Sequence, residues 1–342
     1  MNNYLEGVRK RSQTLLIVEG NHEKNELFRL LFRCFPEMKI SMEDIWIYGT
    51  NIYMLYDDIV KEYGEEWEED DIDLPFVISK KQGMAPLRYK DDFTNIILVF
   101  DYERHDTNFA EEKIIRMQKC FMDSTDMGKL YINYPMIESY QHLRSLPDEE
   151  YADRKISVSL QPGKRYKAIV RKESVIHKII EFPNRLNDLL EKHFYISDTI
   201  SREKCCEKIL AIRTGENLPG QIQKILAGVI NDEFADTANY QLADMIEKVN
   251  YADSLQTYWE YMRNVFQQIV WHNIYKAGAL QYHDASIEWE KYREYFDGID
   301  VKEILKIQNA ASKNSETGII WVLCTCVFLI PEYNLSLVIE EK

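Results

Sequence analysis

The sequence predicts an α/β fold, in which helices flank a parallel β-sheet and a mainly α-helical second domain follows. Two observations indicate this fold. Short apolar runs alternate with segments of helical periodicity through the first 150 residues, and helical periodicity dominates from there on. A chain of 342 residues with 45% apolar and 12% aromatic content can bury a sizeable core. We therefore expect two domains, at residues 1–150 and 151–342.

The first domain is expected to contain four main strands joined by helices. The apolar runs at 15–18, 45–48, 96–100 and 130–134 predict the strands, and the segment at 74–79 is a further candidate. A helix after the first strand should end at Pro36. A second helix should follow a cap at Asn51 and close at Gly64, and a third should run from Phe109 to about residue 121, capped by Asn108.

The second domain is expected to be a set of helices that bind substrate, form a homodimer or dock a partner. Helical periodicity predicts them at 171–181, 201–213, 221–234, 238–249, 255–281 and 286–296. Just before them, the basic stretch at 164–167, with Arg171 and Lys172, is the main positive cluster of the chain. It suits a nucleic-acid backbone, and equally a solvated helix entrance.

Charge, cysteines and hydropathy exclude several classes of protein. The net charge of −15 argues against nonspecific nucleic-acid binding through a broad basic surface. The six cysteines form no paired CxxC zinc pattern, which favours reduced thiols in a cytoplasmic protein. The first 13 residues lack the apolar core of a signal peptide, and the apolar run at 319–330 is shorter than a membrane span.

Acidic residues follow three of the predicted strands. Glu19 follows the first, Asp101 and Glu103 follow the run at 96–100, and Glu138 comes shortly after the run at 130–134. The carboxyl ends of parallel strands lie on one edge of a sheet, so these groups should converge there. Clustered carboxylates repel one another unless a cation lies between them, and oxygen ligands favour Mg²⁺ or Mn²⁺.

Local spacing adds detail to this expected site. Asp101 and Glu103 are two residues apart, so in an extended segment both point the same way, and Tyr102 points into packing. Gly20 permits a tight turn after Glu19, and Glu23 lies one helical turn further on. Any one of these acids alone is more simply a turn or helix-start residue. Their coincidence after three strands favours a metal site.

At these residues the chain resembles the Toprim domain, especially Toprim nucleases of the overcoming-lysogenization-defect class and related effector nucleases of phage defence. The family has a glutamate after its first strand, often as VEG with another acid soon after; here these are Val18–Gly20 and Glu23. Its later DxD motif corresponds to Asp101–Glu103, with glutamate as the second acid. Its IENY-like stretch corresponds to Ile137–Tyr140, which contains Glu138. The resemblance covers roughly residues 13–145.

The resemblance implies a Toprim-like domain that hydrolyses phosphodiester bonds of DNA or RNA with Mg²⁺ or Mn²⁺. Glu19, Asp101 and Glu103 would be metal ligands, and Glu23 and Glu138 would be ligands or supporting catalytic groups. It also implies a toxic antiviral effector controlled by an ABC- or SMC-type ATPase. The chain has no GxxxxGK[ST] loop, so that ATPase would be a separate protein. The alternatives are a noncatalytic regulatory or binding subunit and a primase-type nucleotidyl transferase.

Histidines and basic residues near the motifs are candidates for substrate binding. Lys24, Arg104 and His105 are the first choices, and Lys80 and Lys81 also suit phosphate charge. His22 and His105 each stand beside a proposed carboxylate and suit a general base. An exposed turn histidine or a surface ion pair is the simpler interpretation of each.

Overall fold

The structure is a computed structural model that describes residues 12–252, 255–282 and 292–338. It is an α/β fold, and the chain forms two compact units. The first unit contains residues 1–140, 149–168 and 270–342, and the second contains 141–148 and 169–269. The expected boundary at residue 150 therefore does not describe these units, because the C-terminal segment packs with the sheet. Among the described residues, no helix is long and apolar enough to cross a membrane.

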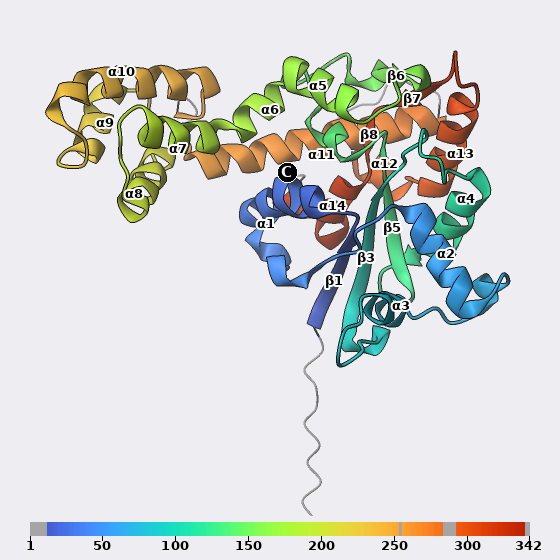
Figure 1. Cartoon of the computed structure of the whole chain (residues 1–342). Helices are drawn as coiled ribbons and strands as arrows, with labels where there is room; N and C mark the ends of the chain where they lie inside the picture. Colours follow the sequence, from blue (N-terminus) through green and yellow to red (C-terminus); the bar gives the residue numbers. More distant parts are fainter. Residues whose placement is uncertain (1–11, 253–254, 283–291, 339–342) are drawn as a thin grey trace, which may run out of the picture. The chain divides into compact units, whose positions relative to one another are not determined.

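The sheet of the first unit has the strand order β2-β1-β3-β5-β4, and β8 also pairs with β5 (Figure 1). Strands β2, β1, β3 and β5 are mutually parallel, whereas β4 and β8 pair antiparallel with β5. The parallel α/β prediction is thus confirmed for the main strands. The strand bounds are β1 Ser12–Val18, β2 Ile45–Ile47, β3 Phe93–Asp101, β4 Met122–Asp123, β5 Gly128–Tyr134 and β8 Leu323–Cys324.

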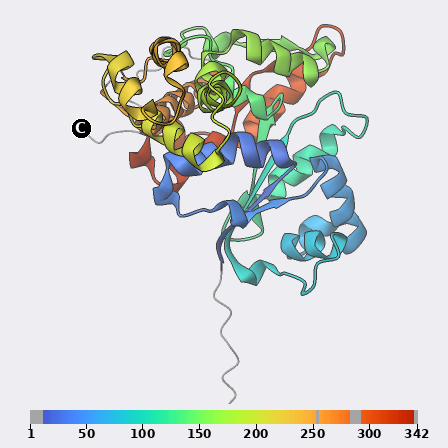
Figure 2. The same cartoon turned by 60° about the vertical axis from the view of Figure 1, so that its left-hand side comes forward.

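The direction of the chain across the sheet reverses at β1. From β1 the chain moves to β2 on one side, and it then crosses to β3 on the other side of β1. Right-handed crossovers place the helices of these two connections on opposite faces, and Figures 1 and 2 show α1 on one side of the sheet and α2 and α4 on the other. The carboxyl ends of β1 and β3 therefore form the switch point where α/β sheets bind ligands.

The helices of the first unit follow the expected order. Asn51 caps α2 as predicted, since its side chain accepts from the Met54 backbone, and Gly64 ends that helix. The candidate strand at 74–79 is wrong: the segment is helix α3, because Asp73 accepts from the Phe76 backbone and fixes a helix start. Helix α4 begins two residues later than expected, with no side-chain cap. The bounds are α1 Arg29–Cys34, α2 Ile52–Tyr63, α3 Leu74–Lys81, α4 Glu111–Cys120, α12 Tyr292–Asp297, α13 Val301–Ser312 and α14 Leu329–Tyr333.

The connection after β1 begins with a π-helical segment. Residues Glu23–Phe28 have the wider i→i+5 winding, and only then does the chain continue as α1 to Cys34, before Pro36 as predicted. π-Helical turns are rare and frequently lie at functional sites. Here the segment begins at Glu23, four residues after Glu19.

The C-terminal segment completes the sheet. The apolar run at 319–330, expected to be a buried element, contributes β7 (Ile319–Trp321), β8 and the start of α14. β7 pairs with β6 (Lys155–Ser157), and β8 pairs with β5. Tyr102, which was expected to point into packing, is fully buried, and its hydroxyl contacts Asn309 Oδ1 (2.6 Å) and Ser312 Oγ (2.9 Å) of α13. The exit of β3 is thereby tied to the C-terminal segment.

The second unit is helical, as the sequence indicates for this region. The expected helix at 171–181 is divided at Ser174, whose hydroxyl accepts from the His177 backbone and starts a new helix. Helix α7 was not predicted, and the expected helix at 286–296 falls partly outside the described residues. The bounds are α6 Val175–Ile180, α7 Phe182–Lys192, α8 Thr199–Leu210, α9 Leu218–Leu226 and α10 Asp232–Val249; α5 (Lys164–Glu173) and α11 (Tyr258–Tyr282) include residues of both units.

Removal of the Tyr102 hydroxyl should lower the stability of the first unit. In Tyr102→Phe, the buried Asn309 Oδ1 loses its donor, and an unmade buried hydrogen bond costs about 1–3 kcal/mol. Denaturant unfolding would measure this change. Tyr89→Phe removes an exposed hydroxyl from the same unit and should change the free energy of unfolding by less than about 0.5 kcal/mol. Equal stability of the two variants would contradict the proposed tie between β3 and α13.

Candidate metal and catalytic site

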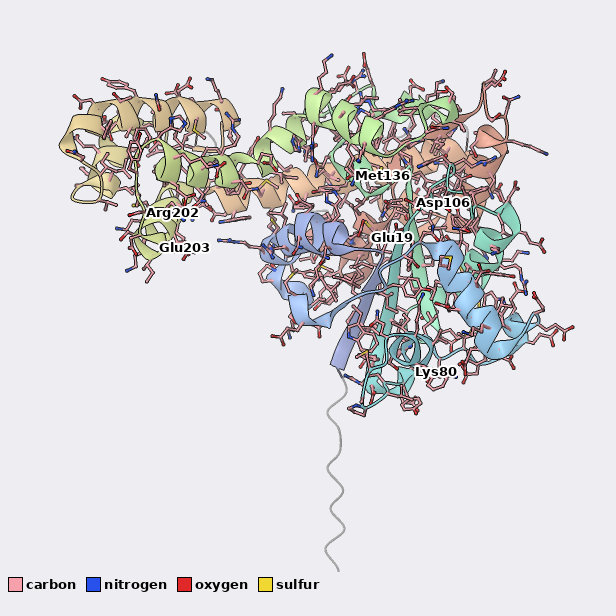
Figure 3. All side chains as sticks on the ribbon, in the orientation of Figure 1. Glu19, Lys80, Asp106, Met136, Arg202 and Glu203 are labelled. Atoms are coloured by element: carbon pink, nitrogen blue, oxygen red, sulfur yellow. The ribbon has the colours of Figure 1, made fainter. Side chains whose placement is uncertain are left out.

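Glu19 and Asp101 lie at the carboxyl ends of the two central strands. Val18 is paired with Val99, so Glu19 follows β1 at the level where β3 approaches its last residue, Asp101. Figure 3 shows Glu19 at the end of β1, with Asp106 and Met136 toward the same end of the sheet and Lys80 toward the other. Two of the predicted acids are thus held by neighbouring backbone at the switch point.

Asp101 is buried and Glu19 is half-buried, and each has a buried oxygen without a partner. Asp101 is 3% exposed. Glu19 Oε2 and Asp101 Oδ1 accept no hydrogen bond from any residue that the structure describes. Buried carboxyl oxygens are normally hydrogen-bonded, and isolated ones are strongly disfavoured when ionised. This pair is therefore an unsatisfied acceptor site inside the protein.

The electrostatic environment strongly disfavours negative charge at this pair. Burial and the neighbouring carboxylates of Glu103 and Glu23 raise the pKa of Glu19 to about 8. Burial, followed by the charge of Glu19, raises the pKa of Asp101 well above its usual value. Like charges in a desolvated site raise one another's pKa, and a divalent cation reverses that effect.

Glu103 lies beside the pair but does not continue the strand. Strand β3 ends at Asp101, and Glu103 adopts a left-handed backbone conformation with φ of 39°. The alternation expected for an extended Asp101–Glu103 segment is therefore wrong at Glu103. A hydrogen bond from the Asn51 side chain partly offsets burial and the charge of Asp106, which together raise the pKa of Glu103. Glu103 remains close enough to Glu19 to affect its pKa.

Glu23 turns back toward the end of β1, as the sequence suggested. Its Oε2 accepts a hydrogen bond from the Gly20 backbone at 2.7 Å, and the residue is 5% exposed. A Cβ at position 20 would lie 3.4 Å from that oxygen, which is an ordinary van der Waals contact. Glu23 thus closes the turn after Glu19 and adds negative charge to the site.

Glu138 is held by two basic groups. It lies in the 3₁₀ helix Ile137–Gln141, and its Oε1 is 2.6 Å from His22 Nε2 and 2.7 Å from Lys167 Nζ. These partners outweigh the effect of burial and lower the pKa of Glu138. The hydrogen bond to Glu138 raises the pKa of His22, so His22 is a structured partner rather than a free turn histidine.

The three residues predicted to bind substrate differ in their surroundings. Lys24 Nζ donates to the Ile45 carbonyl at 3.2 Å and is therefore occupied at β2. The Arg104 guanidinium lies 4.3 Å from the centre of the Phe109 ring. His105 is an exposed residue, but partial burial of its ring lowers its pKa and favours the neutral imidazole. Lys80 and Lys81 form ion pairs with Glu62 and Asp58 instead.

The donor set suits a hard divalent cation, although its ligands are not gathered. Among the described residues, no three acidic, histidine or cysteine side chains are close enough together to hold a metal. The predicted trio is thus represented by Glu19 and Asp101, each with an oxygen that lacks a partner, and by Glu103 nearby. Carboxylate oxygens are the ligands that Mg²⁺ and Mn²⁺ prefer.

Three residues at the site carried no recognisable sequence signal for it. Asn51 was assigned only as a helix cap, and Asp106 was not singled out. Lys167 was assigned to a basic stretch, and nothing in its spacing links it with Glu138, which is 29 residues earlier. The chain matches no protein-family model, no curated protein and no solved structure.

The stability of the protein without divalent cations should fall as the pH rises. Below pH 4.5 Glu19 is protonated in both states, but between pH 4.5 and about 8 the folded protein retains a proton that the unfolded chain releases. Glu19→Gln removes this effect. The advantage of Glu19→Gln over wild type in free energy of unfolding should therefore be roughly 2–4 kcal/mol larger at pH 8.5 than at pH 5. Urea unfolding in EDTA would measure the difference.

Glu112→Gln is the matched control, because it neutralises an exposed glutamate of the same unit. Its stability should follow that of wild type at both pH values. A Glu19→Gln curve parallel to wild type between pH 5 and 8.5 would show that Glu19 ionises normally in the folded protein.

Proposed function

We propose that this chain is a Mg²⁺-dependent nuclease that hydrolyses phosphodiester bonds of DNA or RNA. One observation carries the proposal: Asp101 is buried beside the half-buried Glu19 at the switch point of a parallel sheet, and each has a buried oxygen that lacks a partner. Burial of two such acids is unfavourable unless a proton or a cation accompanies them. The resemblance of 18–20, 101–103 and 137–140 to Toprim motifs supports the cation.

Glu19 and Asp101 would hold the cation, and Glu103 would be the third ligand. A bound divalent cation supplies polarisation of a phosphate and activation of water. Glu23 keeps the turn after β1 in place through its bond to the Gly20 backbone. In this way the residues around the pair fix the position of Glu19.

His22 is suited to donate a proton or to bind a phosphate oxygen. Its contact with Glu138 raises its pKa and favours the imidazolium form, which is a donor and not a base. Its side chain is 36% exposed, so it can be approached from solvent. Lys167 supplies a second positive charge at Glu138, and both cations suit a polyanionic substrate.

The biological setting follows from the resemblance alone. Toprim effectors of this class imply a toxic nuclease in anti-phage defence, active in the cytoplasm and controlled by a separate ABC- or SMC-type ATPase. A homodimer through the helical region would fit the same setting. The net charge of −15 favours substrate binding through local cations such as His22 and Lys167 over binding through the whole surface.

Isosteric neutralisation of the central pair should abolish cleavage. Glu19→Gln and Asp101→Asn each remove one ligand charge, and loss of metal assistance should lower the cleavage rate at least about 100-fold. Single-turnover assays on labelled DNA and RNA with about 5 mM Mg²⁺ would measure the rates. Glu112→Gln should cleave like wild type, and circular dichroism would verify that each variant folds.

The two rival functions predict different results in the same experiment. Full cleavage or toxicity by both folded variants would contradict the catalytic proposal. Nucleic-acid or partner binding without strand loss in the wild type would favour a noncatalytic subunit. Template-dependent polymer formation from added nucleotides would favour a primase-type transferase.

A further inference from the structure

A row of polar residues crosses the sheet next to the proposed cation ligands. Asp101 of β3 is paired in register with Asn133 of β5, and Asn133 is paired with Cys324 of β8. Side chains of residues paired in register project from the same face of a sheet. Asp101, Asn133 and Cys324 therefore stand side by side, and all three are buried. The function proposed above assigns no role to Asn133.

The oxygen of the Asn133 amide is occupied on the β8 side. Asn133 Oδ1 lies 3.3 Å from Cys324 Sγ and 3.4 Å from the backbone nitrogen of Cys326. The backbone N–H of Cys326 can only donate, so the atom facing β8 must be the amide oxygen. Cys324 Sγ is also 3.4 Å from Cys326 Sγ, and its own backbone nitrogen donates to Asn273 Oδ1 at 2.7 Å. This network fixes the orientation of the amide.

The nitrogen of the same amide is left without an acceptor. Asn133 is fully buried, and its Nδ2 has no hydrogen-bond partner among the residues in the described ranges. On the neighbouring strand, Asp101 Oδ1 likewise has no donor. An unused donor and an unused acceptor thus lie on adjacent strands in paired residues. A buried donor and a buried acceptor that both lack a hydrogen bond are unfavourable. This points to a state of the site in which each group has a hydrogen-bond partner.

We propose that Asn133 is a positioning residue for Asp101: with Oδ1 anchored on β8, its Nδ2 donates to Asp101 Oδ1 when that carboxylate holds a cation. This inference rests on the proposed function, because it assumes the cation. Hydrogen bonds to ligating carboxylates orient them, and loss of such a bond typically weakens metal binding about 10- to 100-fold. The C-terminal segment would thereby support the site, although it contributes no ligand.

Two substitutions separate this role from a structural one. Asn133→Leu loses both the donor and the acceptor without adding a charge, whereas Asn133→Asp keeps an acceptor for Cys324 and Cys326 and places a second carboxyl group beside Asp101. Mn²⁺ binding, measured by isothermal titration calorimetry on the full chain, should weaken at least about tenfold in Asn133→Leu. The melting temperature in EDTA should fall in both variants, since Leu leaves the β8 donors unpaired and Asp brings a further carboxyl group into a buried place.

A double-mutant cycle tests whether Asn133 acts through Asp101. Asp101→Asn should weaken Mn²⁺ binding, and adding Asn133→Leu to it should cause no further loss, since coupled residues are non-additive. Unchanged or tighter binding by Asn133→Leu, or additive effects, would overturn the positioning role while leaving the proposed nuclease intact. Wild-type protein that binds no Mn²⁺ would overturn both, which distinguishes the two failures.

Discussion

The central constraint on this structure is the parallel pairing of β1 with β3, which brings the buried Asp101 and the half-buried Glu19 to one edge of the sheet. Six pairs of residues in register, from Ser12↔Phe93 to Val18↔Val99, fix the relation of the strands. The positions of Glu19 and Asp101 follow from that register, because Asp101 is the last residue of β3 and Glu19 comes just after the end of β1. Their mutual repulsion and burial then make the site unfavourable as a structural feature alone. Such strain is expected where a protein retains residues for function.

The surroundings of the pair divide into an acidic and a basic side. Glu23 and Glu103 add negative charge to the pair, and the site is therefore prepared for a cation. Glu138, in contrast, is neutralised by His22 and Lys167, which places positive charge beside it. A phosphodiester needs both features, since its oxygens bind cations and its leaving group needs a proton. Residues from 19 to 167 contribute to this arrangement, so it depends on segments that are far apart in the sequence.

The sequence predicted the features that depend on local pattern and on the order of strands. Apolar runs of four or five residues located β1, β3 and β5, and parallel topology alone was enough to expect Glu19 and Asp101 at one edge. The start of α2 at Asn51 and its end at Gly64 were also predictable from the sequence, since each depends on the chemistry of a single residue. The segment at 74–79 was misassigned because its apolar residues fit either period, and the Asp73 cap decides for a helix.

The remaining features depend on contacts between distant segments. β8 is two residues long, and its pairing with β5 joins Asn133 to Cys324, 191 residues later, so no periodicity marks it. Lys167 meets Glu138, and Tyr102 meets α13, for the same kind of reason. The left-handed backbone of Glu103 was equally hidden, because non-glycine residues seldom adopt it. Here, the strand ends were predictable, but the groups that surround and orient the acids were not.

The most direct test of the central claim is anomalous diffraction from crystals soaked in MnCl₂. The account predicts one or more anomalous peaks within coordinating distance of both Glu19 and Asp101, with Glu103 turned toward the ion. Crystals of Asp101→Asn should lose the peak. A soaked wild-type structure with no peak there, and with the two carboxyl groups sharing a proton between them, would contradict the claim that this pair is a cation site.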